Sequence, residues 1–174
     1  MNDERETPLS PIGRVHIIGP SGSGKSTIAR RLSRLINAPV QSLDKIAYAD
    51  AHAGGYRQAR SRGDRIKEVR SYCSGERWIA EGAYFQWLGG SFKHADIIIV
   101  LKVPADIRDR NLVNRHADNE DPEVLSRLRR ASQEFDALLD SRIKSFLRPY
   151  QSKVKVFSSP RKVFKYFRRL PLGS

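Results

Sequence analysis

The chain has 174 residues, which is enough for one domain with a substantial core and too few for two ordinary domains. Its hydrophobic fraction of 39% and charged fraction of 29% are typical of a globular protein, and no apolar run approaches the roughly 18 residues of a membrane span. The single cysteine, Cys73, excludes an internal disulfide and a cysteine-based zinc cluster, and the amino terminus has no secretory signal pattern, so we expect a cytoplasmic protein.

The net charge of +13 is concentrated in two parts of the sequence. Residues 54–72 are rich in arginine and lysine, and no acidic residue follows Asp140 although basic residues continue to Arg169. Such patches favour anionic partners, which include nucleotides, nucleic acid and acidic membrane surfaces. A solvated basic face without a partner explains the composition equally well.

The amino-terminal half alternates short apolar runs with helical patterns. Residues 14–18 predict a buried strand that enters a glycine-rich turn, and residues 25–36 predict a helix whose apolar side chains share one face. Residues 39–43 predict a second strand, residues 56–72 a basic helix, and residues 77–82 a third strand.

The alternation continues toward the carboxyl terminus. A brief helix is expected around 83–89, and the β-branched run at 95–103 predicts a strand buried on both faces, which Pro104 ends and a helix follows. The remaining elements are a long helix, a last strand and a basic helix, at about 123–147, at 153–157 and from near Pro160.

Strands that alternate with helices indicate an α/β fold, with a five-stranded parallel sheet flanked by helices on both faces. Ligands of such sheets bind at the carboxyl ends of the strands, so Asp96, which begins its strand, is excluded from the site. We expect a single domain over 13–170, between a flexible tail at 1–12 and a short tail at 171–174.

The stretch GPSGSGKST at 19–27 matches the phosphate-binding pattern G-x-x-x-x-G-K-[ST]. Its glycines let backbone N–H groups approach phosphate oxygens, and the helix that follows offers its positive end to an anion. We expect Lys25 to bridge the β- and γ-phosphates, Ser26 to ligate Mg²⁺ and Thr27 to contact the α-phosphate. The predicted nucleotide site comprises Gly19, Ser21, Gly22, Ser23, Gly24, Lys25, Ser26 and Thr27.

Four sequence elements in a fixed order resemble the small P-loop kinases related to adenylate, shikimate and gluconate kinases. They read RVHIIGPSGSGKST, SLD, WIAEGAY and DIIIVL, at 14–27, 42–44, 78–84 and 96–101. The pattern is most similar to the adenylate-kinase-like proteins labelled "DNA topology modulation" proteins. The resemblance covers most of the chain and implies a nucleoside-monophosphate-kinase-like fold that transfers the γ-phosphate of ATP with Mg²⁺.

The resemblance also implies roles for two carboxylates and one arginine. Asp44 corresponds to the acidic residue that faces the phosphoryl acceptor, although a helix cap or a loop residue is the alternative interpretation. Glu81 ends the third strand and is expected to contact Mg²⁺ through water, or else the acceptor. Arg108 is expected to lie over the adenine, a role for which Arg110 competes.

A short lid at 115–122 is the next feature that the resemblance implies. Arg115 and Arg127, at and beyond its ends, are expected to face the phosphates, although each taken alone is as well explained as a surface residue. The stretch FSSPRKV at 157–163 matches the segment that lines the adenine pocket in these kinases.

The acceptor-binding region at 44–76 matches no familiar acceptor pattern, and its basic helix fits an anionic acceptor. Four aromatic residues could stack on a base or pack in the core: Tyr56, Tyr84, Phe85 and Trp87.

Three functions remain open. The first is an ATP-dependent kinase of a small anionic acceptor such as a nucleotide, and the set of Asp44, Glu81 and the lid arginines favours it. The second is a nucleic-acid-directed protein, either a polynucleotide 5′-kinase or an ATP-dependent DNA- or RNA-binding protein, which the basic carboxyl-terminal segment favours. The third is a nucleotide-gated interaction protein without transferase activity. We expect a monomer or a weak dimer in each case.

Overall fold

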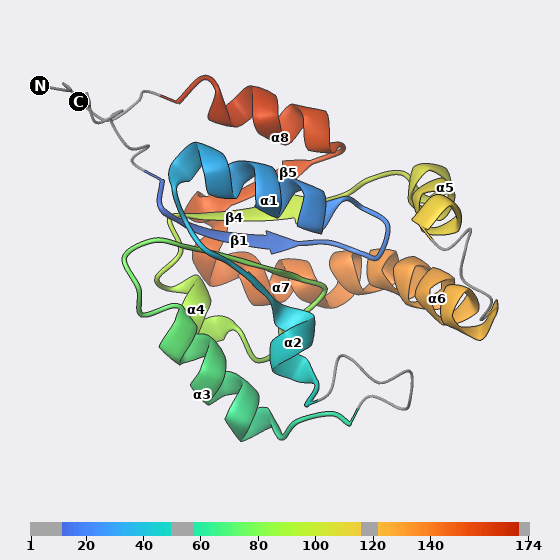
Figure 1. Ribbon diagram of the computed structural model, residues 1–174, viewed down its shortest axis with the longest axis horizontal. Coiled ribbons are helices and arrows are strands. Elements are labelled where there is room, and N and C mark those ends of the chain that lie inside the picture. Colours follow the sequence, from blue (N-terminus) through green and yellow to red (C-terminus); the bar gives the residue numbers. More distant parts are fainter. Residues whose placement is uncertain (1–11, 50–57, 116–121, 171–174) are drawn as a thin grey trace, which may run out of the picture.

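The computed structural model describes residues 12–49, 58–115 and 122–170, and these form an α/β fold around one parallel sheet (Figure 1). The sheet has the strand order β2-β3-β1-β4-β5, and every pairing in it is parallel. Its strands are β1 (Arg14–Ile18), β2 (Val40–Ser42), β3 (Trp78–Gly82), β4 (Ile97–Leu101) and β5 (Val154–Phe157). The predicted five-stranded parallel sheet is therefore confirmed.

Helices connect the strands, and one of them, at Leu43–Ala47, has no counterpart among the predicted elements. They are α1 (Lys25–Ile36), α2 (Leu43–Ala47), α3 (Arg62–Tyr72), α4 (Gly89–Phe92), α5 (Ala105–Arg115), α6 (Pro122–Leu138), α7 (Lys144–Leu147) and α8 (Pro160–Phe167). A π-helical turn, η1 (Leu139–Ile143), joins α6 to α7, and a 3₁₀ segment, η2 (Arg148–Lys153), leads into β5. No helix in the described part of the chain is long and apolar enough to cross a membrane.

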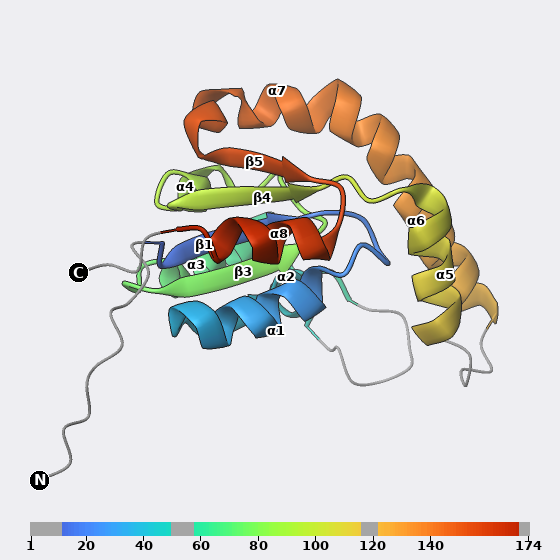
Figure 2. The same ribbon diagram turned by 90° about the horizontal axis from the view of Figure 1, so that it is seen from above.

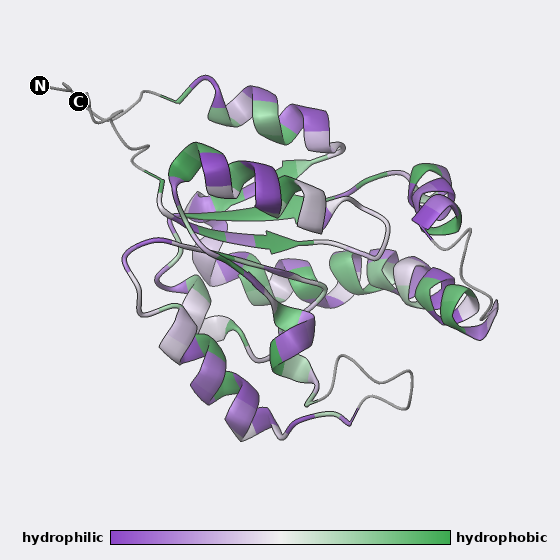
Figure 3. Cartoon of the chain, viewed as in Figure 1, coloured by the Kyte–Doolittle hydropathy of each residue, from purple (hydrophilic) through white to green (hydrophobic). Residues whose placement is uncertain are grey.

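The helices cover both faces of the sheet, as Figure 2 shows from above. Alternate residues of β1 serve the two faces, because successive side chains of a strand point to opposite sides. Val15 and Ile17 pack with α1 and α8, whereas Ile18 packs with residues of α3, α4 and α6. Because both of its faces are covered, the central strand β4 is hydrophobic and buried along its whole length, and it is green throughout in Figure 3.

Two predicted helices differ from the structure. The helix expected around 83–89 is wrong: this stretch is a loop, and α4 begins only at Gly89. Phe85, Trp87 and Leu88 have the spacing of a helix, but each is buried in the core from an irregular backbone. The basic helix expected from residue 56 begins at Arg62, where the Ser61 side chain caps it.

The segment before α3 is extended because it pairs with the end of α2. Ala49 donates a backbone hydrogen bond to the carbonyl of Gln58, and Arg60 donates one to the carbonyl of Ala47. The pairing uses backbone groups that a helix would need, so the helix cannot start earlier within 58–61.

The amino-terminal edge of the sheet is closed by Asp96. Its carboxylate accepts hydrogen bonds from the backbone N–H groups of Gly13 at 2.9 Å and Arg14 at 2.8 Å. Asp96 therefore has a structural role at the edge opposite the nucleotide loop, which agrees with its exclusion from the site.

His16 is a fully buried polar residue of β1, and it has a measurable consequence for stability. Its Nε2 lies 3.0 Å from the hydroxyl of Ser91, and its ring packs edge-on against Trp78 and Phe92. Burial lowers the pKa of His16 to about 3. The folded protein therefore holds this imidazole in its neutral form.

We predict a stability loss in acid that depends on His16. Its pKa is about 3 in the folded state and about 6.5 when unfolded, so between these values the unfolded chain binds the extra proton. This contribution to stability is complete above the unfolded pKa and is lost as the pH falls toward 3. Urea unfolding at several pH values gives the free energy of unfolding as a function of pH. Between the two pKa values, this free energy should fall less steeply in His16→Leu than in wild type, by up to about 1.4 kcal/mol per pH unit. Equal slopes for the two proteins would contradict this assignment.

Candidate functional site

The glycine-rich turn between β1 and α1 needs glycine at two positions. Gly22 and Gly24 have φ angles of 79° and 87°, in the left-handed region that other residues rarely adopt. A Cβ on Gly22 would also lie 2.4 Å from the carbonyl oxygen of Arg108. The turn therefore packs directly against α5 and leads into the amino end of α1, the geometry of an anion-binding loop.

Lys25 is the first residue of α1, and its ammonium group folds back over the turn. Its Nζ donates a hydrogen bond to the carbonyl of Pro20 at 2.8 Å. Burial lowers the pKa of Lys25, the carboxylates of Glu81 and Asp44 oppose that shift, and Arg115 adds to it. These four charged groups interact electrostatically, so the structure brings together Lys25, Asp44, Glu81 and Arg115 as the sequence predicts.

Glu81 lies at the carboxyl end of β3, buried beside the turn. Its Oε1 accepts a hydrogen bond of 3.2 Å from the hydroxyl of Ser26. Burial raises the pKa of Glu81, and nearby Lys25 opposes this rise.

Ser26 and Glu81 form a donor set that suits a magnesium ion held by a nucleotide. Mg²⁺ in such sites takes one or two protein oxygens, together with phosphate oxygens and water, instead of a complete protein cage. The hydroxyl of Ser26 and the carboxylate of Glu81 lie together at the loop and could supply these two protein oxygens.

Asp44 lies in the first turn of α2, one residue beyond the predicted strand ending, and its side chain is exposed. It accepts a hydrogen bond of 2.7 Å from the hydroxyl of Tyr84. Burial and the charge of Asp44 raise the pKa of Tyr84, so this phenol stays protonated as a donor. The sequence placed Tyr84 only among stacking or packing aromatics, and its bond to Asp44 was missed.

The predicted lid arginines occupy different environments. Arg115, exposed at the end of α5, is close enough to Lys25 to influence its pKa. Arg127 is exposed on α6 and makes no hydrogen bond or ion pair with the residues that the structure describes. Most of the predicted lid, residues 116–121, lies outside the described residues. The phosphate-facing roles of both arginines stay predictions.

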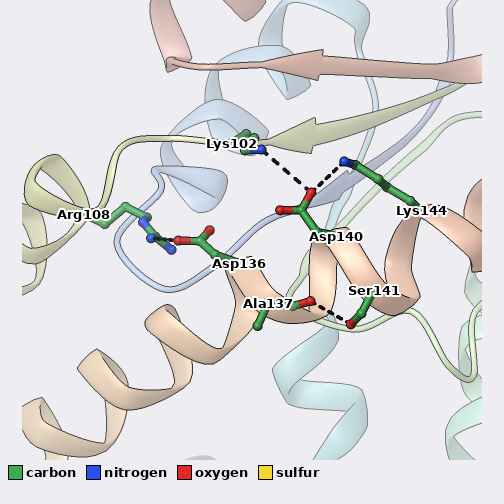
Figure 4. A network of polar contacts seen from close by, with 7 residues as sticks. All are labelled: Lys102, Arg108, Asp136, Ala137, Asp140, Ser141 and Lys144. Atoms are coloured by element: carbon green, nitrogen blue, oxygen red, sulfur yellow. Dashed lines mark hydrogen bonds and ion pairs between the residues drawn. The ribbon is translucent and has the colours of Figure 1, made fainter.

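Arg108 is buried between α5 and α6, as Figure 4 shows. Its guanidinium donates to the carbonyl of Ser132 at 2.7 Å and forms an ion pair with Asp136. Only 1% of the residue is exposed, so its guanidinium is covered by protein in this arrangement. The predicted contact of Arg108 with an adenine stays a prediction, and the competing Arg110 is exposed beside Asp106.

Two further residues hold the nucleotide loop from outside. Asn111 of α5 donates a hydrogen bond of 2.9 Å to the carbonyl of Gly22, and Ser132 of α6 donates one of 3.1 Å to the carbonyl of Ser21. These bonds orient the loop carbonyls toward α5 and α6. Both partners are distant in the sequence from the loop, so no local pattern identifies them.

A cavity of about 420 Å³ lies between the loop after β3 and the helical segment around η1. Its lining combines two aromatic rings with several polar groups: Phe85, Gln86, Ser141, Arg142, Ser145 and Phe146. Arg62 of α3 reaches the same region, because its side chain donates a hydrogen bond of 3.4 Å to the carbonyl of Gln86. The cavity adjoins Tyr84 along the chain.

Comparison with known proteins identifies similar folds. No protein-family model matches the sequence, and no curated protein matches it. A gluconokinase from Sinorhizobium meliloti 1021 is similar in structure, with a TM-score of 0.58 at 12% identity over 94% of this chain and 91% of that one.

Two shikimate kinases are also similar. The enzyme from Bacteroides thetaiotaomicron has a TM-score of 0.55 at 17% identity, over 91% of this chain and 96% of that one. The enzyme from Acinetobacter baumannii, in complex with shikimate, has a TM-score of 0.55 at 12% identity, over 92% of this chain and 93% of that one. The chain therefore has the fold of small P-loop kinases.

We predict that Ser132 contributes to nucleotide affinity through the loop. Ser132→Ala removes the hydroxyl bonded to Ser21 but keeps the backbone carbonyl that Arg108 uses. One lost hydrogen bond of about 1 kcal/mol should raise the Kd for Mg-ATP roughly fivefold, measured by isothermal titration calorimetry.

The matched control is Ser126→Ala, the same substitution at an exposed position of α6. It should leave the Kd unchanged. Equal affinities for the two variants would show that the bond between Ser132 and the loop does not support binding.

Proposed function

We propose that this protein is an ATP-dependent kinase that transfers the γ-phosphate to a hydroxyl group of a small anionic acceptor. The observation that carries the proposal is the pair of carboxylates beside the loop. Glu81 is buried against Ser26, whereas Asp44 is exposed and held by Tyr84. Different environments suit them to different roles, one toward the metal and the other toward the acceptor.

The described side chains account for the charge movements of such a transfer. The acceptor hydroxyl attacks the γ-phosphorus and gives its proton to Asp44, while the bond to the β-phosphate oxygen breaks and ADP leaves. Lys25 offsets the negative charge on the phosphates, with Arg115 and Arg127 in the same role. Mg²⁺, when bound near Ser26 and Glu81, supplies further charge neutralisation. Tyr84 orients the Asp44 carboxylate through its hydrogen bond.

The cavity lined by Phe85 and Gln86, the residues that follow Tyr84 in the chain, suits the body of a small acceptor. Its volume of about 420 Å³ fits a small molecule, and Arg142 and the serine hydroxyls of its lining match an acid bearing hydroxyl groups or a phosphate. A nucleotide remains among the candidate acceptors.

The order of the four sequence motifs supports the finer resemblance to the "DNA topology modulation" proteins.

The names of the structural neighbours, gluconokinase and shikimate kinase, are those of small-molecule kinases and support this class of acceptor. A kinase of polynucleotide ends is not favoured by them.

We predict that some member of an acceptor panel stimulates release of ADP from Mg-ATP. The panel contains hydroxy acids, nucleosides and nucleoside monophosphates, and a coupled assay measures the ADP. Lys25→Ala should abolish the stimulated rate. Asp44→Asn should still bind ATP but lose roughly 10²- to 10⁴-fold in kcat, the usual contribution of a general base. Full acceptor-dependent turnover in Asp44→Asn would contradict the proposed mechanism.

We predict a separate effect of Arg142 on the acceptor. Arg142→Gln should raise the KM for the acceptor by about tenfold or more, because a charge-assisted hydrogen bond is worth about 1.5–3 kcal/mol. The KM for ATP should be unchanged. Arg148→Gln, an exposed arginine of the next helical turns that does not line the cavity, is the control. An unchanged acceptor KM in Arg142→Gln would remove the cavity from the acceptor site.

A further inference from the structure

Basic residues from two distant segments meet on one face of the molecule. Helices α1 and α8 cover the same face of the sheet and lie side by side (Figures 1 and 2). They are in direct contact, because the Arg31 guanidinium lies 4.2 Å from the centre of the Phe164 ring. The exposed cations of the two helices, together with the two arginines that follow α8, define the α1–α8 basic face: Arg30, Arg31, Arg34, Arg161, Lys162, Lys165, Arg168 and Arg169.

This face carries no compensating acid of its own. The sequence has no aspartate or glutamate in residues 25–36 or 158–170, and none of the ion pairs among the described residues includes a cation of the face. The other basic segment, α3, differs in this respect. It contains Asp64 and Glu68, and Glu68 pairs with Arg60. Helix α3 therefore has the mixed charges of an ordinary solvated surface, and the α1–α8 basic face does not.

The apolar side of α8 is already used inside the protein. Val163 and Phe167 are buried in the core with residues of α1, and Arg31 covers Phe164. Among the described residues, α8 contributes no exposed large hydrophobic side chain. Helix α1, which the structure describes in full, exposes one large hydrophobic side chain, Leu35. A single leucine is not the apolar stripe that inserts into lipid, and the face has no open aromatic surface on which single-stranded bases stack. Its chemistry is that of phosphate contacts alone.

The dimensions of the face match an extended polyanion. The twelve residues of α1 span about 18 Å, and two packed helices lie about 8–10 Å apart. A duplex carries one charge per about 1.7 Å, so roughly ten phosphates occur along that length. A mononucleotide would occupy only a few of these cations, whereas a duplex backbone reaches across both helices.

We propose that the α1–α8 basic face binds the phosphate backbone of double-stranded nucleic acid without reading its sequence. This surface goes beyond the proposed kinase site and is not its acceptor pocket. Pro160, at the start of α8, lies against Gly24 of the nucleotide loop, so a bound duplex would run beside that loop.

The test measures duplex binding of the full chain by fluorescence anisotropy. Labelled DNA and RNA duplexes of about 20 base pairs are titrated at salt concentrations from about 50 to 200 mM, over which six to ten phosphate contacts lower affinity about 10³- to 10⁵-fold. Two double variants each remove two charges from the face, Arg30→Gln/Arg34→Gln in α1 and Arg168→Gln/Arg169→Gln after α8. Circular dichroism shows whether each variant is folded. Because the two variants lie in separate parts of the face, the other one still tests the proposal if one of them misfolds.

Each face variant should bind the duplexes at least about tenfold more weakly at intermediate salt. The slope of the logarithm of the binding constant against the logarithm of the salt concentration should decrease in magnitude by up to about 1.8. The matched control, Lys67→Gln/Arg70→Gln in α3, should bind like wild type. Absence of duplex binding, or an equal loss in the control, would overturn the proposal. Binding to vesicles of phosphatidylcholine and phosphatidylserine without binding to either duplex would overturn it as well.

Discussion

The parallel pairing of β3 with its two neighbours is the constraint on which the site depends. In register, Glu81 lies beside Ile17 of β1 on one side and Ser42 of β2 on the other. Because β1 leads into the nucleotide loop and β2 leads into α2, the end of β3 brings Glu81 close enough to Lys25 and Asp44 for both charges to influence its pKa. A shift of this register would separate Glu81 from the loop and from Asp44.

This arrangement places opposite charges in partly buried surroundings, where desolvation is costly. Burial moves the pKa of Lys25 down and that of Glu81 up, and the attraction between the two opposes both shifts. The hydroxyl of Ser26 donates a hydrogen bond to the buried carboxylate of Glu81, and the hydroxyl of Tyr84 donates one to the exposed carboxylate of Asp44. The bonds from Asn111 and Ser132 fix the loop in turn, so the segments on either side of the predicted lid also support the loop. The site is thus prepared for a charged ligand before one binds.

Local patterns predicted the parts of this structure that local physics determines. The β-branched runs, the glycine-rich turn and the helix after it follow from periodicity and backbone preference, and the rule on strand ends correctly gathered Lys25, Asp44 and Glu81. Tertiary packing determined the rest. The loop at 83–88 has helical spacing, but its apolar side chains are buried from an irregular backbone. The burial of Arg108 depends on Asp136, and the support of the loop depends on Ser132, and neither partner is close in the sequence.

The central claim is that these residues transfer a phosphoryl group to an acceptor instead of to water. The test uses ATP whose γ-phosphate carries a heavy oxygen isotope at its peripheral positions. This ATP is incubated with the protein, Mg²⁺ and a mixture of small hydroxyl-bearing acids and nucleotides, and mass spectrometry then shows which product carries the label. Direct transfer predicts a phosphorylated acceptor, a phosphate ester of a hydroxyl group or a phosphoanhydride of a nucleotide, that retains all of the heavy peripheral oxygens. Heavy label found only in inorganic phosphate would identify a hydrolase and contradict the kinase assignment.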